Sequence, residues 1–294
     1  MYVIVGASGF LGSYFIKNIL EHTDEEILAV ARMTKEDADR RIHWVSCDIS
    51  NPDEVTILNR AFLSKISGKK IVYLAAYHNP DMVEKHPQFA WDVNVTSLSR
   101  FLNMVEDVKC FYYPSSDSVY GESANGYAFR ENDALNPMNR YGMQKCVAEK
   151  LVTGYGYNVV RYPFLIGPSL LPQKEHFYDK IIRSITNGYP MQMFEDSYRS
   201  AISFDTAAHL VISLIENCAQ EVPRILNVCG DEALSKYDIG VMIAQKFGIS
   251  SELIQPVSIL EDQNIFEAKR AVSTLMDNRM VKKILGLAEI KLSF

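Results

Sequence analysis

Residues 2–12 read Tyr2-Val3-Ile4-Val5-Gly6-Ala7-Ser8-Gly9-Phe10-Leu11-Gly12. The first four residues are apolar, which predicts a buried strand, and the pattern from Gly9 onward predicts a helix. Gly6 permits the tight turn between them, Gly9 lets a phosphate approach the backbone, and Gly12 lets helix and strand pack closely. The free N–H groups of the first helical turn suit a pyrophosphate. The stretch therefore predicts a dinucleotide-binding turn, the alternative being a turn with only a structural role.

The end of the second predicted strand indicates which dinucleotide to expect. Sites for NAD usually place an acid there, which binds the ribose 2′-hydroxyl. This chain has Ala31 at that position, followed by Arg32. A guanidinium suits a 2′-phosphate, and no carboxylate at that position repels it. We therefore expect NADP rather than NAD, the alternative being that Arg32 is a solvated surface residue.

Short apolar runs alternate with helix-like segments through the first two thirds of the chain. The predicted strands are 2–5, 27–31, 43–47, 71–75, 110–114 and 158–162, and the predicted helices are 9–21, 52–63, 88–105 and 139–153. Continuous apolar strands separated by helices predict an α/β fold with a doubly wound parallel sheet of the Rossmann type.

The rhythm changes after Gly167-Pro168, where we predict helices over 177–186 and 235–247 and a further strand over 225–229. We expect an NADP-binding domain over residues 1–167, which residues 202–229 rejoin. A smaller C-terminal substrate-binding lobe would then comprise residues 168–201 and 230–294.

The composition narrows the function classes. The chain has 294 residues, of which 48% are hydrophobic and 22% charged, which is typical of a globular protein. Its net charge of −6 disfavours nucleic acid or an anionic membrane as a partner. No signal peptide is evident, and no apolar run approaches the roughly 20 residues that cross a bilayer. We therefore expect a cytoplasmic protein.

The cysteines give no sign of a metal centre or a disulfide framework. Their number is odd, they are scattered and they form no C-x-x-C pair: Cys47, Cys110, Cys146, Cys218 and Cys229. Neither a structural zinc site nor a set of disulfides is expected from this spacing.

Tyr141 and Lys145 stand four residues apart on a predicted helix, which places both on one face. A positive charge beside the phenol is expected to lower a pKa that starts at about 10. Tyr141 could then pass a proton to a carbonyl oxygen as a hydride arrives, or take one in the reverse direction. Lys145 could also hold the cofactor's ribose, although the spacing alone is common on helices.

A second polar stretch follows a predicted strand and reads Pro114-Ser115-Ser116-Asp117-Ser118-Val119-Tyr120-Gly121. Ligands of doubly wound sheets bind at the carboxyl ends of strands. A hydroxyl there can donate to a substrate oxygen and polarise a carbonyl. The alternative is a polar turn at the strand's end.

Taken in order, Gly-x-x-Gly-x-x-Gly, Ser-Ser-x-x-Val-Tyr-Gly and Tyr-x-x-x-Lys resemble the extended short-chain dehydrogenases/reductases. That group includes NAD(P)-dependent nucleotide-sugar epimerases, dehydratases and reductases. The resemblance implies that Ser116 polarises the carbonyl, that Tyr141 is the acid/base, and that Lys145 assists it and binds ribose. The implied cofactor contacts are Gly6, Ser8, Gly9, Phe10, Leu11, Gly12, Arg32, Asp48, Ile49, Leu74, Ala75, Ala76, Tyr141, Lys145, Tyr162 and Pro163.

The branch of the group is less sharply marked. The dehydratases carry a glutamate where Ser118 stands, the fucose-synthase branch has a cysteine near Ser118, and the epimerases have an asparagine where Phe164 stands. His176 falls near a histidine of the fucose-synthase branch, although a lone loop histidine is usually structural. Residues 75–84 and 226–238 resemble the dTDP-4-dehydrorhamnose reductases most, which implies an NADPH-dependent reductase of a nucleotide-linked keto sugar.

In that interpretation the substrate is bound by Tyr77, Ser116 and Arg199. The guanidinium of Arg199 suits a diphosphate, its alternative being a surface ion pair. Asp117 would be a further catalytic residue that orients the sugar or adds acid character, the alternative being a turn residue.

Two other functions stay open: a related epimerase or dehydrogenase, and an NADP-binding regulatory subunit without turnover, as in the reductase-like partner of methionine adenosyltransferase. The resemblance also implies a homodimer that pairs through the Tyr-x-x-x-Lys helix and the central helix. The apolar residues Met143, Val147 and Leu151 could instead belong to the core.

Overall fold

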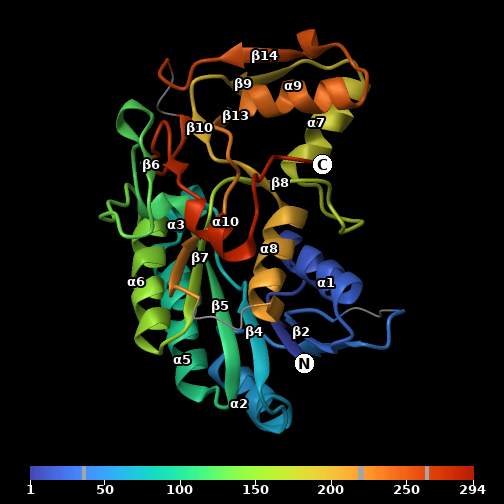
Figure 1. Cartoon of the computed structure of the whole chain (residues 1–294), viewed down its shortest axis with the longest axis vertical. Helices are drawn as coiled ribbons and strands as arrows, with labels where there is room; N and C mark the ends of the chain where they lie inside the picture. The colour runs from blue at the N-terminus through green and yellow to red at the C-terminus, as the bar shows by residue number, and fades with distance from the viewer. Residues whose placement is uncertain (35–37, 218–221, 262–264) are drawn as a thin grey trace.

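The computed structural model describes residues 1–34, 38–217, 222–261 and 265–294. Within these residues seven parallel strands form one sheet (Figure 1). In spatial order they are β3 (Ile42–Ser46), β2 (Ile27–Ala31), β1 (Tyr2–Val5), β4 (Lys69–Tyr73), β5 (Val108–Ser116), β7 (Asn158–Tyr162) and β12 (Ile225–Asn227). The α/β fold class with a parallel sheet is confirmed.

The direction in which the sheet grows changes at its centre. From β1 the chain adds β2 and β3 on one side, and then returns to add β4, β5, β7 and β12 on the other. This reversal leaves a crevice outside the carboxyl ends of β1 and β4, where doubly wound folds bind ligands. The glycine turn follows β1 directly, so the topology places it in this crevice.

Two layers of helices cover the sheet because alternate residues of each strand face opposite sides. Tyr2 and Ile4 pack with α1 (Phe10–His22), α8 (Phe204–Asn217) and α10 (Arg279–Leu285). Val3 and Val5 pack on the other face with α2 (Pro52–Ala61), α5 (Ser97–Met104) and α6 (Arg140–Gly154). Figure 1 shows α8 and α1 on one side of the strands and α5 and α6 on the other.

A separate apolar cluster lies beyond the carboxyl edge of the sheet, at the top of Figure 1. Its main elements are α7 (Phe177–Thr186), α9 (Lys236–Lys246), β9 (Met191–Phe194) and β14 (Ile254–Val257). Three short two-stranded ladders complete the described structure: β8 (Leu165–Ile166) with β11 (Ile202–Ser203), β10 (Tyr198–Arg199) with β13 (Leu234–Ser235), and β6 (Ala128–Phe129) with β15 (Leu275–Met276). The division into a cofactor domain and a substrate lobe stays a prediction.

Most predicted elements exist, and their ends differ by one or two residues. The largest correction concerns the helix predicted over 88–105. The chain instead forms α3 (Pro80–Lys85), α4 (Pro87–Trp91), a π-helical turn over Asp92–Thr96 and then α5. Asn94, inside that turn, accepts a hydrogen bond from the Tyr77 N–H at 2.7 Å and donates to the Tyr77 carbonyl at 3.0 Å. The turn thus places Asn94 where it holds the loop after β4.

No helix in the described part of the chain is long and apolar enough to cross a membrane. Across those same ranges, no cluster of three His, Cys, Asp or Glu side chains could hold a metal ion. Cys47, Cys110, Cys146 and Cys229 are free thiols, and Cys218 lies outside the described residues.

Candidate active site

The glycine turn is shaped by close backbone contacts. Gly6 has a φ of +91°, and a Cβ there would lie 2.7 Å from the Ala75 nitrogen. A Cβ on Gly12 would lie 2.6 Å from the Ala7 carbonyl oxygen, so the helix can approach the turn only without a side chain. Gly9 is the N-cap of α1, whose first turn has no acidic residue and, among described residues, no side-chain cap. Its N–H groups suit a pyrophosphate.

A pocket of about 780 Å³ runs from this turn across the carboxyl ends of the central strands. It brings together residues from the glycine turn, the ends of β2 and β4, the Ser116 loop, α6 and the loop after β7. Every residue that the sequence singled out for catalysis, cofactor or substrate lines this one pocket. The structure therefore supports a single composite site, while the role of each residue stays a prediction.

Gly142 lets the helix that carries Tyr141 approach the Ser116 loop. A Cβ on Gly142 would lie 2.5 Å from the Ser118 carbonyl oxygen and 2.9 Å from Cβ of Pro137. Asn139 caps this helix by accepting from the Gly142 N–H at 2.9 Å. Tyr141 is thereby held beside the Ser116 loop, and Ser116 influences the pKa of its hydroxyl.

Lys145 points elsewhere. Its ammonium donates to the Tyr113 hydroxyl at 2.9 Å and to the Pro114 carbonyl at 2.8 Å. The ammonium nitrogen is 5.8 Å from the centroid of the Tyr141 ring. Lys145 thus anchors α6 to β5. It lies beside the Tyr141 ring, while its ammonium donates its hydrogen bonds to Tyr113 and Pro114.

The expected lowering of the Tyr141 pKa is wrong for this structure. Burial, reinforced by the Asp117 carboxylate, raises the pKa of Tyr141 well above its usual value, although the Ser116 hydrogen bond opposes the rise. Burial also lowers the pKa of Lys145 to about 7, against the opposing charge of Glu149. Desolvation outweighs the attraction between phenolate and ammonium, so Tyr141 is held as a proton donor.

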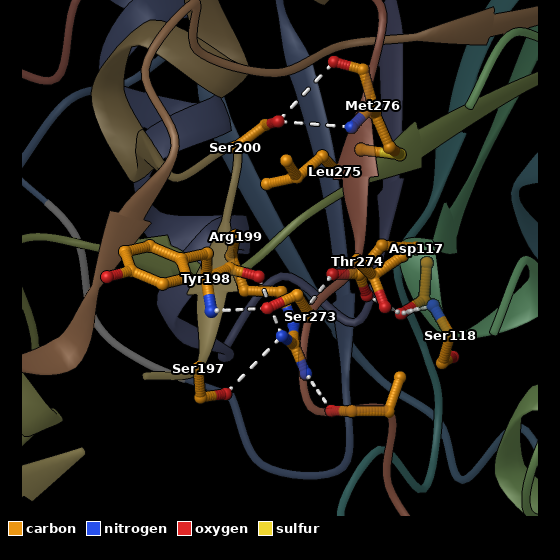
Figure 2. Close-up of polar contacts among 12 residues, drawn as sticks. Asp117, Ser118, Ser197, Tyr198, Arg199, Ser200, Ser273, Thr274, Leu275 and Met276 are labelled. Carbon is orange, nitrogen blue, oxygen red and sulfur yellow. Dashed lines mark hydrogen bonds and ion pairs between the residues drawn. The ribbon is translucent and has the colours of Figure 1, made fainter. Parts of the chain in front are cut away.

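Asp117 and Arg199 form an ion pair inside the pocket. Oδ2 of Asp117 lies 3.5 Å from Nε of Arg199, and the two side chains are 13% and 22% exposed. Figure 2 shows the pair beside Thr274, the residue before β15. Nη1 of Arg199 donates to the Tyr198 and Val272 carbonyls at 2.8 Å, and Nη2 to the Ala271 carbonyl at 2.8 Å. Protein partners thus hold the guanidinium predicted to bind a diphosphate.

The remaining predicted cofactor residues also line the pocket. Arg32 is exposed after β2, and Asp48 accepts hydrogen bonds from the Ser50 N–H and hydroxyl at 2.9 and 2.7 Å. These bonds, despite some desolvation, lower the pKa of Asp48, with a further contribution from Arg32. The Tyr162 hydroxyl donates to the Ala207 carbonyl at 2.9 Å, so this end of Tyr162 anchors α8.

Four basic side chains that sequence reasoning did not assign to the site also line the pocket: His78, Lys174, His176 and Arg270. Lys174 donates to the Ser8 carbonyl at 3.3 Å, and the His176 ring stands edge-on to Phe10 at 5.0 Å. Burial lowers the pKa of His176 to about 4, so this ring is neutral near pH 7. A loop far along the chain thus covers the glycine turn, and no local motif signalled it.

The fold and the site together define a parallel α/β protein with a glycine turn after its first strand and a serine, a tyrosine and a lysine at one crevice. The profile of a family described as the RmlD substrate binding domain matches residues 1–291. The chain belongs to this family, which confirms the resemblance drawn from the motifs.

Relatives and solved structures carry different names. Methionine adenosyltransferase 2 subunit beta of Xenopus tropicalis is 26% identical over 239 residues, which is 76% of this chain and 67% of that protein. The crystal structure of dTDP-4-dehydrorhamnose reductase of Bacillus anthracis in complex with NADP has a TM-score of 0.79 and 19% identity, covering 99% of this chain and 94% of the other. UDP-glucuronic acid 4-epimerase of Bacillus cereus, in complex with UDP-glucuronic acid and NAD, has the same TM-score and identity, covering 100% and 95%. The two structures establish the likeness of fold.

Proposed function

We propose that the protein is an NADP(H)-dependent oxidoreductase that reduces a keto group of a nucleotide-linked sugar. The observation that carries the proposal is the convergence of Ser116, Tyr141 and Lys145 with the glycine turn on one pocket. The Bacillus anthracis reductase, similar in fold over nearly its whole length, supports the same activity. A related epimerase or dehydrogenase activity would use the same residues.

The site offers a place for each part of the cofactor. The amides of the first turn of α1 would hold its pyrophosphate, and Lys145 would hold the ribose next to the nicotinamide. When bound, the cofactor would supply the hydride. Tyr141 would donate its hydroxyl proton to the substrate oxygen, and Ser116 would hold that oxygen in place. The raised pKa of Tyr141 favours this direction because the phenol starts protonated.

The preference for NADP rests on Arg32, which is exposed at the end of β2, and on Ala31, which brings no carboxylate. We expect a higher kcat/KM with NADPH than with NADH. Arg32→Ala should reduce that preference by about tenfold, as loss of a charge-assisted contact to phosphate would. Arg60→Ala, at an exposed arginine of α2, is the matched control and should leave the preference unchanged. A wild-type preference for NADH would overturn this choice of cofactor.

Two arginines that line the pocket favour an anionic substrate. Arg199 and Arg270 both line the pocket, and each is paired with one acid, Asp117 and Asp81 respectively. Tyr77 lines the same space, with its backbone held by Asn94. NADPH oxidation across a panel of nucleotide-linked 4-keto sugars tests the substrate class. A matched set of keto sugars without phosphate should be reduced far more slowly.

A regulatory role is the second candidate, because methionine adenosyltransferase 2 subunit beta is among the similar sequences. Tyr141→Phe separates the two. A reductase should lose about 100-fold or more in kcat, since a positioned proton donor contributes that much. A regulatory subunit should keep its effect on a partner enzyme. Whichever of the two functions holds, NADPH should raise the melting temperature of wild type and of Tyr141→Phe equally. This measurement controls for folding and cofactor binding.

We also propose a homodimer formed through α5 and α6. Met143 and Val147 on α6 are 52% and 37% exposed, so they are not core residues of the single chain. They lie on the helix that carries Tyr141. Val147→Glu should convert a dimer into a monomer in light scattering coupled to gel filtration. A monomeric wild type would refute the pairing.

A further inference from the structure

The loop between β8 and α7 lies against the glycine turn, and Figure 1 shows it in yellow-green beside α1. We call its residues Ser169–His176 the strap. The Lys174 ammonium donates to the Ser8 carbonyl at 3.3 Å, and the His176 ring stands edge-on to the Phe10 ring at 5.0 Å. Ser8 and Phe10 flank the N-cap of α1. The strap therefore places a cation and an aromatic ring against the start of that helix.

One carboxylate holds both ends of the strap. Oδ1 and Oδ2 of Asp179, in α7, each accept from the Ser169 N–H at 3.1 Å, and Oδ2 also accepts from the His176 N–H at 2.8 Å. Next to the first end, the Tyr14 hydroxyl of α1 donates to the Pro168 carbonyl at 2.6 Å. The strap is thus fixed to α7 and to α1, and the ammonium that it carries is presented to the glycine turn.

Lys174 has donors to spare and no acidic partner among the described residues. Its one hydrogen-bond partner there is the Ser8 carbonyl, whereas an ammonium can donate three hydrogen bonds. The nearest acids along the chain are engaged elsewhere. Glu175 pairs with Arg183 at 2.9 Å, and Asp179 accepts from the backbone of the strap. Lys174 lines the pocket with its charge uncompensated.

The place of this cation is one that folding alone disfavours. The N-terminus of a helix carries a partial positive charge, which attracts anions and repels cations. The first turn of α1 has no acidic residue, and Gly9 gives it no side-chain cap among the described residues. Lys174 reaches the residue directly before this N-cap, so two positive features meet at the glycine turn. A phosphate bound there would be attracted by both.

We propose that Lys174 is a further cofactor-binding residue whose ammonium contacts the pyrophosphate at the first turn of α1, and that Asp179 is the positioning residue that holds the strap. This inference rests on the dinucleotide binding of the proposed function. It does not depend on the choice of NADP, because NAD carries the same pyrophosphate. Lys174 adds a full charge to a turn whose other donors are backbone amides, and it therefore strengthens cofactor binding without entering the chemical step.

Fluorescence titration with NADPH tests the contact. Lys174→Gln should raise the Kd about tenfold, as loss of a hydrogen bond from a charged group would, and the difference should shrink as salt is added. Lys174→Arg should keep most of the affinity because it keeps the charge. Lys180→Gln, which removes an equal charge from α7 outside the pocket lining, is the matched control and should bind like wild type. Equal Kd values for wild type and Lys174→Gln would overturn the inference.

A smaller probe shows which phosphate Lys174 contacts. Adenosine 2′-monophosphate carries the 2′-phosphate of NADP but no pyrophosphate. In competition with NADPH, its Kd should be the same for Lys174→Gln and wild type, and should rise in Arg32→Ala. If Lys174→Gln weakened this probe as much as it weakens NADPH, Lys174 would belong to the 2′-phosphate, and the pyrophosphate contact would be overturned.

The role of Asp179 is tested by coupling. Asp179→Ala should raise the Kd for NADPH, and Lys174→Gln should add little in that background, because the strap no longer presents the ammonium. Asp179→Asn keeps one acceptor oxygen and should recover part of the affinity. Melting temperatures without cofactor show how far each variant changes stability itself. Fully additive losses of affinity would overturn the positioning role.

Lysine acetylation of the wild-type protein, read by peptide mass spectrometry, separates this inference from the proposed function. NADPH should slow acetylation of Lys174 several-fold and leave Lys180 unchanged. If it does so and no keto sugar is reduced, the reductase function fails and this inference stands. If wild type turns over while neither the labelling of Lys174 nor the Kd of Lys174→Gln responds, this inference alone fails. If neither NADPH nor NADH raises the melting temperature of wild type, both fail.

Discussion

Arg161 in β7 and Glu149 in α6 form an ion pair in the core, and removing the carboxylate should unfold the protein at a lower temperature. Both residues are 1% exposed. Nε and Nη2 of Arg161 donate to the two carboxylate oxygens at 2.9 and 2.6 Å. Nη1 donates to the Tyr120 hydroxyl at 2.6 Å and to the Glu131 carbonyl at 3.0 Å. Glu149→Ala would leave this guanidinium buried and without its counter-charge.

The size of the effect follows from burial. Breaking a buried pair by removing one partner costs about 3–5 kcal/mol, because an unpaired charge stays in the core. With about 2.1 cal/mol/K of unfolding entropy per residue, a chain of 294 residues has roughly 0.6 kcal/mol/K near its midpoint. The midpoint should therefore fall by roughly 5–8 °C. Circular dichroism during heating, with urea unfolding as a check, measures it.

A paired replacement supplies the control. Glu149→Leu combined with Arg161→Met removes both charges and should cost less than Glu149→Ala alone, since no charge is left unpaired. The reasoning would be refuted if Glu149→Ala cost under about 1 kcal/mol, or if the paired replacement cost more than the single change. Because α6 also carries Tyr141 and Lys145, the same variants show how far the site depends on this anchor.

Three further predictions follow from the site. Lys145→Met should raise the free energy of unfolding of the cofactor-free protein more at pH 6 than at pH 9.5. Burial lowers the pKa of Lys145 to about 7, so below that pH the buried ammonium destabilises the folded protein fully. Above that pH the folded protein releases the proton, and this destabilisation declines. Urea titrations at the two pH values measure this, and equal gains would count against it. Gly142→Ala should lower kcat by about tenfold or more, because the new Cβ would lie 2.5 Å from the Ser118 carbonyl oxygen and would displace α6. An unchanged kcat would show that α6 does not need this close approach to the Ser118 loop. Asn94→Ala should cost about 1–3 kcal/mol in urea unfolding, because the Tyr77 N–H and carbonyl lose their side-chain partner, and a neutral result would mean that water replaces it.

Much of the site could be predicted because its chemistry is local in the sequence. Gly6, Gly9 and Gly12 are close neighbours, and a strand before them and a helix after them suffice to define the turn. Tyr141 and Lys145 share a helix face by spacing alone. Ser116 follows a strand, and parallel strands bring their carboxyl ends to one edge. The glycine turn, Ser116, Tyr141 and Lys145 all line the same pocket.

The sequence by itself thus determined the strand–turn–helix unit, the α/β class and the grouping of Tyr141 with Lys145 on one helix, since each depends on short-range spacing. The tertiary structure alone decided how deeply those residues are buried and which charges lie beside them. The pKa of Tyr141 rises rather than falls because packing removes water from both Tyr141 and Lys145 and turns the ammonium toward Tyr113. Asp117 meets Arg199 because a segment far along the chain folds back across the pocket. Burial and contacts between distant segments carry no local signature, and they set the electrostatics on which the chemistry depends.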